Sequence, residues 1–126
     1  MAKKKSQRHQ GERAAGQWTE AKFMQFLRSG LRQMHMRWPA KYAYQSWVRR
    51  DKPPGTVGKH KYEYQCAECG EWFPKKLIQI DHIVPCGSLK TFDDLPGFVE
   101  RMFCEPSGYQ CLCLVCHEKK TDEDRK

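Results

Sequence analysis

The chain has 126 residues, of which 30% are charged, and its formal net charge is +8. It contains no run of about twenty apolar residues, which excludes a membrane-spanning helix. The opening stretch MAKKKSQRHQGERAAG lacks the apolar core of a secretory signal. We therefore expect one compact domain with a small appendage, working without a membrane in the reducing cytoplasm.

The charge is divided unevenly along the chain. Residues 1–52 carry 13 Lys and Arg against 3 Asp and Glu, a net charge of +10. Residues 53–126 carry 10 Lys and Arg against 12 Asp and Glu, a net charge of −2. Aromatic side chains are interleaved with the basic ones, which favours a nucleic-acid partner over a solubilising tail for the first half.

The first predicted elements are a disordered basic tail over 1–16 and a basic helical region over 17–52. The tail has no bulky apolar side chain, and its Lys3, Lys4 and Lys5 are candidates to meet phosphates. A helix is predicted over 19–37, with Thr19 as its N-cap and an apolar stripe at helical spacing. The stripe consists of Phe23, Phe26, Leu27, Leu31 and Met34.

A second helix is predicted from Pro39 to Arg50, because proline suits the first turn of a helix. Its aromatic face could be core or an interface with another protein. The better candidates for phosphate contacts in this region are four basic side chains, Arg37, Lys41, Arg49 and Arg50.

Proline and glycine in DKPPGTVGKHK predict a linker over 53–61, followed by a second domain over 62–126. Within that domain YEYQCAECGEWF is typical of strand, tight turn and strand. A short strand is predicted over 77–80, a short helix over 91–103 and a final helix over 114–124.

Two Cys-x-x-Cys pairs indicate a zinc site. The pairs are Cys66 with Cys69 and Cys113 with Cys116, and 43 residues separate them. Four thiolates complete a tetrahedral structural zinc site, and a reducing compartment disfavours disulfides. The alternative is a set of buried thiols. The remaining cysteines are interpreted as apolar residues or free thiols, with Cys111 a possible alternative ligand.

A second site is indicated by Asp81 and His82 at the end of the strand and by His117 directly after the last cysteine. The dipeptide could simply end the strand in a polar turn, and His117 could replace a cysteine as zinc ligand. The functional interpretation is a divalent cation held by Asp81 and His117, with His82 as general base on a water. Magnesium, manganese, nickel and zinc all suit these ligands. Lys119 and Lys120 are candidates for contact with the DNA backbone, or ordinary helix surface.

Residues 62–121 resemble an HNH endonuclease domain through YQCAECGEWF, IQIDHIVPCGSL and YQCLCLVCHEKKT. The resemblance implies an α+β fold, with a ββα-metal core inside a treble-clef-like zinc frame. It places Asp81 and His117 as cation ligands and His82 as the general base. It places the four paired cysteines as structural zinc ligands. The earlier MRWPAKY more loosely resembles small phage-encoded HNH proteins, which implies a bacterial host cytoplasm.

One position departs from the family pattern. The middle Asn, which usually braces the loop that bears the base histidine, falls on Gly108. Ser107 or Gln110 could substitute for it. A weakened or conditional nuclease is therefore expected rather than an inactive one.

The function expected from these observations is metal-dependent cleavage or nicking of double-stranded DNA. The first alternative is a zinc protein that binds nucleic acid without cutting. The second is a factor that binds a host protein or the phage DNA-packaging machinery.

Overall fold

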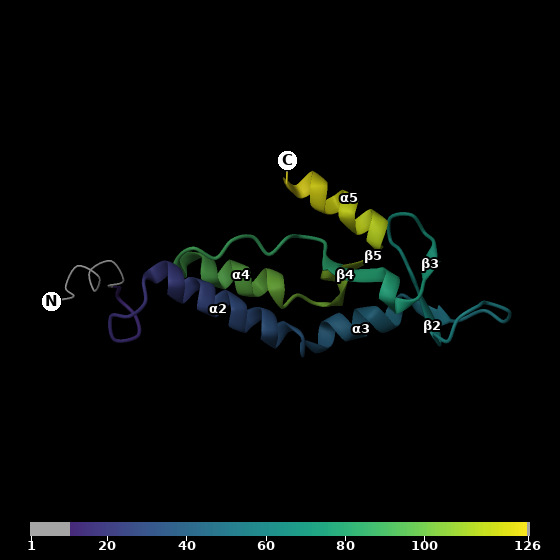
Figure 1. Ribbon diagram of the computed structural model, residues 1–126, viewed down its shortest axis with the longest axis horizontal. Helices are drawn as coiled ribbons and strands as arrows, with labels where there is room; N and C mark the ends of the chain where they lie inside the picture. The colour runs from purple at the N-terminus through teal and green to yellow at the C-terminus, as the bar shows by residue number, and fades with distance from the viewer. Residues whose placement is uncertain (1–10, 126) are drawn as a thin grey trace. The chain divides into compact units, whose positions relative to one another are not determined.

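The structure is a computed structural model that describes residues 11–125. In this range the chain is mixed α+β, with four α-helices and two small antiparallel sheets (Figure 1). The helices are α2 (Glu20–His35), α3 (Pro39–Trp47), α4 (Leu95–Met102) and α5 (Leu114–Arg125). The predicted α+β class is confirmed at this level. None of the helices in the described range is long and apolar enough to cross a lipid bilayer.

The described chain forms two compact units that do not follow the predicted division. The helical unit joins the described part of Met1–Trp38 to Pro85–Phe103. The cysteine unit joins Pro39–Val84 to the described part of Cys104–Lys126. The physical reason is packing, because side chains from residues 85–103 share a core with α2. No change in local composition indicates this shared core.

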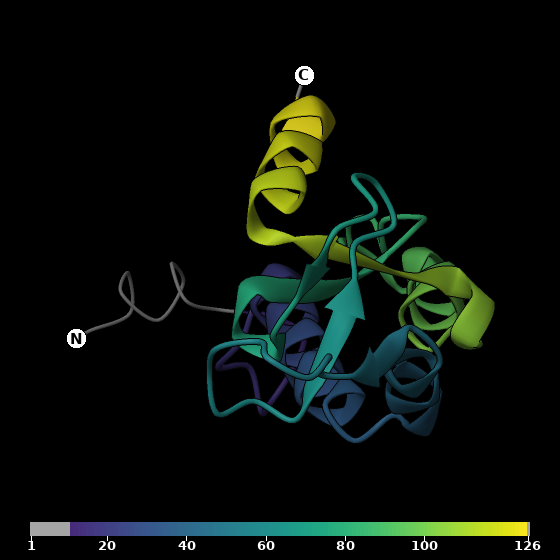
Figure 2. The same ribbon diagram turned by 90° about the vertical axis from the view of Figure 1, so that its right-hand side faces the viewer.

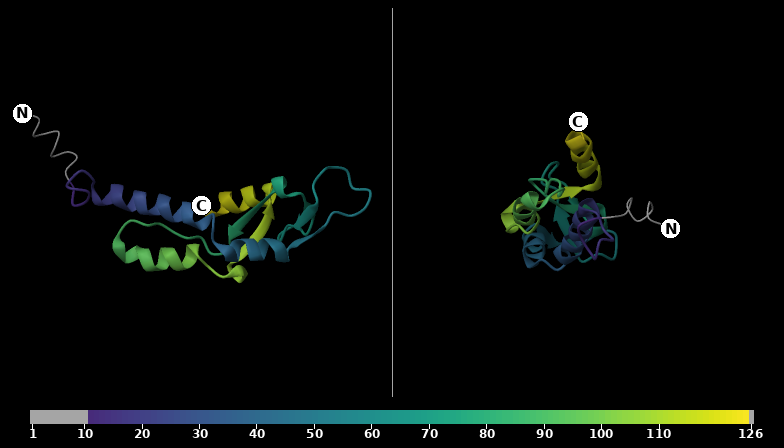
Figure 3. Two further views of the ribbon diagram at one scale, coloured as in Figure 1. Left: turned by 90° about the horizontal axis from the view of Figure 1, so that it is seen from below. Right: turned by 90° about the vertical axis from the view of Figure 1, so that its left-hand side faces the viewer.

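The helical unit is built on α2 and α4, which lie side by side (Figures 1 and 3). Helix α2 begins after Thr19, whose side-chain oxygen accepts a hydrogen bond from the Lys22 backbone N–H at 3.1 Å, as predicted for an N-cap. The buried core of the unit consists of Met24, Leu89, Phe98 and Met102.

The predicted apolar stripe of α2 is partly wrong. Phe23, Leu27 and Leu31 pack against the core of the helical unit, but Phe26 and Met34 are 56% and 51% exposed. The fully buried residue of this helix is Met24. The face that packs is therefore rotated from the predicted one, because α4 and the segment before it contact α2 on the Met24 side.

Residues 11–18 form a turn rather than the disordered segment predicted up to residue 16. Arg13 and Trp18 make an antiparallel bridge. The Arg13 guanidinium donates to a Glu20 carboxylate oxygen at 3.0 Å and lies 4.6 Å from the centroid of the Phe23 ring. These contacts order the end of the predicted tail. Its first ten residues, with Lys3, Lys4 and Lys5, lie outside the described residues.

The cysteine unit begins with α3, which is shorter than predicted. It ends at Trp47, and the residues expected to complete it form strand β1 (Arg49–Asp51), which pairs antiparallel with β2 (Tyr62–Gln65). Strand β3 (Trp72–Phe73) pairs with the other edge of β2. The predicted linker over 53–61 therefore lies in the connection between two paired strands. Pairing with β2 satisfies backbone groups that a longer helix would have used.

The second sheet pairs β4 (Ile78–His82) with β5 (Tyr109–Cys113), and α5 continues directly from β5 (Figure 2). Strand β4 extends two residues beyond the predicted 77–80, and a 3-10 turn over Lys75–Leu77 precedes it. Strand β5 was not predicted as an element. Its residue Cys111 is fully buried, and the Cys111 backbone N–H donates to the Tyr44 hydroxyl at 2.9 Å. This bond ties α3 to the sheet.

Candidate metal centres

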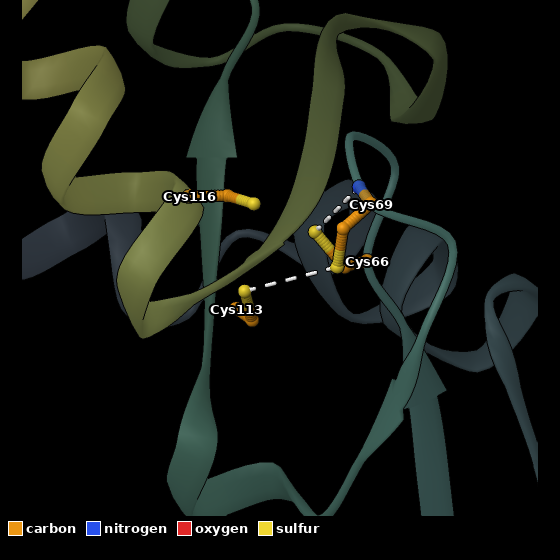
Figure 4. A group of neighbouring side chains, drawn as sticks. All are labelled: Cys66, Cys69, Cys113 and Cys116. Atoms are coloured by element: carbon orange, nitrogen blue, oxygen red, sulfur yellow. Dashed lines mark hydrogen bonds between the residues drawn. The ribbon is translucent and has the colours of Figure 1, made fainter.

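The four predicted zinc ligands lie together in the cysteine unit. Cys66 and Cys69 belong to the turn after β2, Cys113 ends β5, and Cys116 lies in the first turn of α5. Gly70 closes that turn with a φ of 77°, a left-handed conformation that favours glycine. The four side chains point toward one another (Figure 4).

The spacing of the sulfur atoms fits one tetrahedral metal ion. All four lie within 4.8 Å of one another, and the Sγ atoms of Cys69 and Cys113 are 4.0 Å apart. A zinc–sulfur distance of about 2.3 Å places tetrahedral ligands roughly 3.8 Å apart. The cluster could therefore hold a structural metal such as zinc.

The protonation of the cluster also suits metal binding. Burial of Cys66 opposes ionisation, but hydrogen bonds from neighbouring backbone N–H groups, Cys69 first, outweigh it and lower the pKa of Cys66 to about 6. A hydrogen bond with Cys113, together with burial and the Cys66 charge, raises the pKa of Cys116 to about 12. Binding of a metal would therefore release protons from thiols of the cluster.

Neither alternative zinc ligand belongs to the cluster. Among the described residues, the four paired cysteines are the one group of three or more Cys, His, Asp or Glu with converging ligand atoms. Cys111 instead packs with Tyr64 and Ile78, and burial raises its pKa to about 12. Its role is that of a buried apolar residue, one of the two roles predicted for the unpaired cysteines.

The structure brings Asp81 and His117 together, and His117 directly follows Cys116 of the cysteine cluster. Asp81 is the fourth residue of β4, and His117 is the fourth residue of α5. Asp81 Oδ2 and His117 Nε2 are 3.9 Å apart, and their side chains are 29% and 35% exposed. A carboxylate oxygen and an imidazole nitrogen at this separation, both partly open to solvent, could contact the same cation.

Lys120 also reaches this site, from the next turn of α5. Its ammonium donates to Asp81 Oδ2 at 2.9 Å and to the His82 carbonyl oxygen at 2.7 Å. The Lys120 side chain is 22% exposed. Sequence reasoning interpreted Lys120 as a DNA contact or as ordinary helix surface and missed its ion pair, since that pair depends on how α5 lies against β4.

His82 ends β4 directly opposite Tyr109 of β5. The two rings lie 5.0 Å apart between centroids, and the His82 backbone N–H donates to Asp81 Oδ1 at 2.9 Å. The ring contact positions the imidazole. Sequence reasoning missed Tyr109, because the only signal for it was the unpredicted strand β5.

Gly108 braces the end of β4 through its backbone. Its carbonyl oxygen accepts a hydrogen bond from the Ile83 N–H at 2.9 Å. A Cβ at this position would lie 2.6 Å from Cys104 Sγ, so a side chain here would require Cys104 to move. Glycine at the position of the expected Asn is thus accompanied by a backbone contact to Ile83, the residue that follows His82.

The predicted phosphate-contacting residues of the first half are placed differently from one another. Arg37 lies exposed at the end of α2 in the helical unit. Lys41 lines a pocket of about 180 Å³ in the cysteine unit with Lys75, and burial and the Lys75 charge lower the Lys41 pKa. Two lysines sharing one small pocket form a favourable place for an anion.

Arg49 and Arg50 are both engaged within the first sheet. Arg49 stacks 4.0 Å over the Tyr62 ring, and Arg50 lies 4.1 Å over the Trp72 ring. Arg50 also donates to the nearly buried carboxylate of Glu63 at 2.9 Å. These contacts stabilise the sheet and leave Arg50 less able to neutralise a phosphate than sequence alone suggested.

The exposed Lys119 lines a pocket of about 290 Å³ next to Lys120. Cys69, Cys116 and Gln110 also line it, as do Glu68 and Glu123. The acidic side chains reduce its attraction for phosphate, so the basic character of this surface is weaker than predicted.

Fold and site together define a mixed α+β chain with a four-cysteine cluster that could hold a structural metal. Comparisons with protein-family models, with curated proteins and with solved structures each found no match.

Proposed function

We propose that this protein is a metal-dependent DNA endonuclease of the HNH type. The observation that carries the proposal is the approach of His117 Nε2 to within 3.9 Å of Asp81 Oδ2, with His82 next to Asp81 at the end of β4. The order β4, β5 and α5 supports a ββα-metal core. The cysteine cluster supports a surrounding zinc frame.

The donor set fits a divalent cation. Asp81 offers a carboxylate oxygen and His117 an imidazole nitrogen, and both side chains are partly open to solvent. Such mixed oxygen and nitrogen ligands suit magnesium, manganese, nickel or zinc. When bound, the cation would stabilise negative charge on the phosphate and on the leaving oxygen.

His82 is proposed as the general base that takes a proton from the attacking water. Its ring is positioned by Tyr109, and the following residue is held by the Gly108 carbonyl. A histidine suits this role because its ordinary pKa lies near neutrality. The backbone brace supports an active enzyme despite the glycine at position 108.

DNA is the proposed substrate, in double-stranded form. The net charge of +10 over residues 1–52 favours a polyanion and would raise the local DNA concentration. Phosphate contacts are proposed for Lys3, Lys4, Lys5, Arg37, Lys41, Arg49, Arg50, Lys119 and Lys120. Such contacts position a duplex without reading its sequence.

Nicking of supercoiled plasmid by the zinc-loaded full chain tests the proposal. Magnesium, manganese and nickel would be compared with EDTA, and wild type with His82→Ala. General-base catalysis contributes roughly 10²–10⁴-fold, so His82→Ala is expected to lower the nicking rate by about that factor. His60→Ala removes an imidazole elsewhere in the cysteine unit and serves as the control. Absence of cleavage with every metal, from folded protein that binds DNA, would refute the nuclease.

A second candidate is a zinc protein that binds nucleic acid without cutting. The ion pair of Lys120 with Asp81 favours it, because this carboxylate already has a positive partner. It requires salt-sensitive DNA binding that is unchanged in His82→Ala.

The exposed Trp47 and Tyr42 of α3 are the surface that would serve a protein partner, such as a host protein or packaging factor.

A further inference from the structure

Asp81 Oδ2 faces two groups at once. Lys120 Nζ lies 2.9 Å from this oxygen, and His117 Nε2 lies 3.9 Å from it. The Lys120 ammonium therefore occupies a position beside the carboxylate oxygen that the proposed cation would use. Since α5 places Lys120 one turn after His117, both side chains reach the end of β4 from the same helix face.

A carboxylate oxygen that accepts an ammonium at this distance is already compensated in charge. A divalent cation bound to the same oxygen would bring two like charges within a few ångströms of each other. Their repulsion is strong in a site that is partly shielded from water. The cation and the Lys120 ammonium thus cannot both remain on Asp81 Oδ2 without a large penalty.

We propose that Lys120 is the internal counter-ion of Asp81, and that a divalent cation binds only as Lys120 leaves this carboxylate. The released ammonium then meets a phosphate of the bound DNA. This inference rests on the proposed function, because it takes Asp81 as a cation ligand. Lys120 is here a positioning residue that regulates occupancy of the cation site.

Two consequences follow from this exchange. Without DNA, the protein binds a divalent cation weakly, because Lys120 competes for Asp81. With DNA, a phosphate offers Lys120 another partner, so DNA and cation strengthen each other's binding by the same factor. Departure of Lys120 also removes a donor from the His82 carbonyl, so cation binding loosens the end of the strand that carries the base.

The test is manganese binding by the zinc-loaded full chain without DNA, followed by the electron paramagnetic resonance signal of free Mn²⁺. Mn²⁺ prefers oxygen and nitrogen ligands and leaves the four thiolates to zinc. Lys120→Met removes the charge but keeps much of the side-chain length. Removal of a neighbouring positive charge is expected to tighten Mn²⁺ binding roughly tenfold. Lys119→Met removes the same charge one residue away and is the matched control, with less than about a twofold effect expected from a solvent-screened charge.

Further variants separate the possible failures. If Lys120→Met binds Mn²⁺ no more tightly than wild type while Asp81→Asn abolishes binding, the counter-ion role is wrong and the cation site stands. If Asp81→Asn binds Mn²⁺ as wild type does, the cation site itself is wrong, and both proposals fail. Zinc content and thermal unfolding verify folding of each variant, and Lys120→Gln replaces Lys120→Met if the latter does not fold.

A second readout adds a short duplex. In wild type, duplex DNA should tighten Mn²⁺ binding, and in Lys120→Met this enhancement should be smaller, because only the direct contact of the cation with the phosphate remains. An equal enhancement in both proteins would overturn the transfer of Lys120 to a phosphate.

Discussion

Different interactions stabilise the helical unit and the cysteine unit internally. The helical unit buries long apolar side chains, with Met24, Leu89 and Phe98 almost fully removed from solvent. The cysteine unit has two small clusters, centred on Cys111 and on Cys66 with Leu112 and Cys113. A short chain segment with so little apolar volume would gain much of its stability from a metal bound at the cysteine cluster. The proposed chemistry lies in the second unit, where a bound metal and hydrogen bonds, rather than apolar packing, would fix the side chains of the candidate site.

Loss of the metal is the change expected to affect the stability of the two units most differently. Cys113→Ser removes one ligand of the cluster, and structural zinc contributes on the order of 10 kcal/mol to the folding of small metal domains. We expect loss of zinc and of amide protection in β4 and β5, with protection retained in α2. Hydrogen exchange with zinc analysis measures both. Cys86→Ser, in the helical unit, should keep its zinc; equal loss of protection in both units would contradict the comparison.

The converse change is Phe98→Ala in the helical unit. Phe98 is 1% exposed, and truncation of a buried phenylalanine costs about 3–5 kcal/mol. We expect amide protection in α2 and α4 to fall while zinc content and protection in β4 stay unchanged. The exposed Glu100→Ala in the same helix is the control. A loss of zinc in Phe98→Ala would show that the two units do not fold separately.

A substitution at Gly108 would measure how closely the cysteine unit is packed around the candidate site. Gly108→Asn introduces the residue typical of HNH enzymes, but its Cβ would meet Cys104 Sγ at 2.6 Å. Overpacking of this kind costs about 1–3 kcal/mol, so we expect a lower melting temperature and no gain in nicking. Combination with Cys104→Ala should recover part of the loss. A stable and faster Gly108→Asn would show that the backbone brace is a poor substitute for the Asn side chain.

The smallest expected effect is a pH dependence of the cysteine unit. The Arg50 hydrogen bond outweighs burial and, with His60, lowers the pKa of Glu63 below its ordinary 4.5. A lowered folded-state pKa means that Glu63 stabilises the fold above pH 4.5, and that this contribution disappears as pH falls through the folded value. Glu63→Gln should therefore lose stability near neutral pH, and its difference from wild type should shrink in acid. Urea unfolding measures it, with Glu100→Gln as the control; a constant difference would contradict the assignment.

Local patterns were sufficient for several features of this chain. The two Cys-x-x-Cys pairs predicted the cluster, because each pair is closed by its own turn and four thiolates favour one shared metal. The Thr19 cap predicted where α2 begins. Both predictions rest on residues that are close in sequence. The predicted cluster requires in addition only that the two cysteine pairs come together in the fold.

Other features depend on how distant segments pack. Sequence placed Asp81, His82 and His117 as candidates, but the 3.9 Å approach of Asp81 to His117 required β5 to pair with β4 and α5 to follow it. The ion pair of Lys120 arises from the same arrangement. Strand register and helix direction result from the sum of many weak contacts, which no short motif encodes.

The division of the chain shows the same limit. A Pro- and Gly-rich segment suggested a linker, but it joins β1 to β2, and residues 85–103 pack with α2 instead of the cysteine unit. Composition reveals where a chain can turn. Which apolar faces then meet, and so which residues form a unit, is decided by burial in three dimensions, as with Met24 against Phe98.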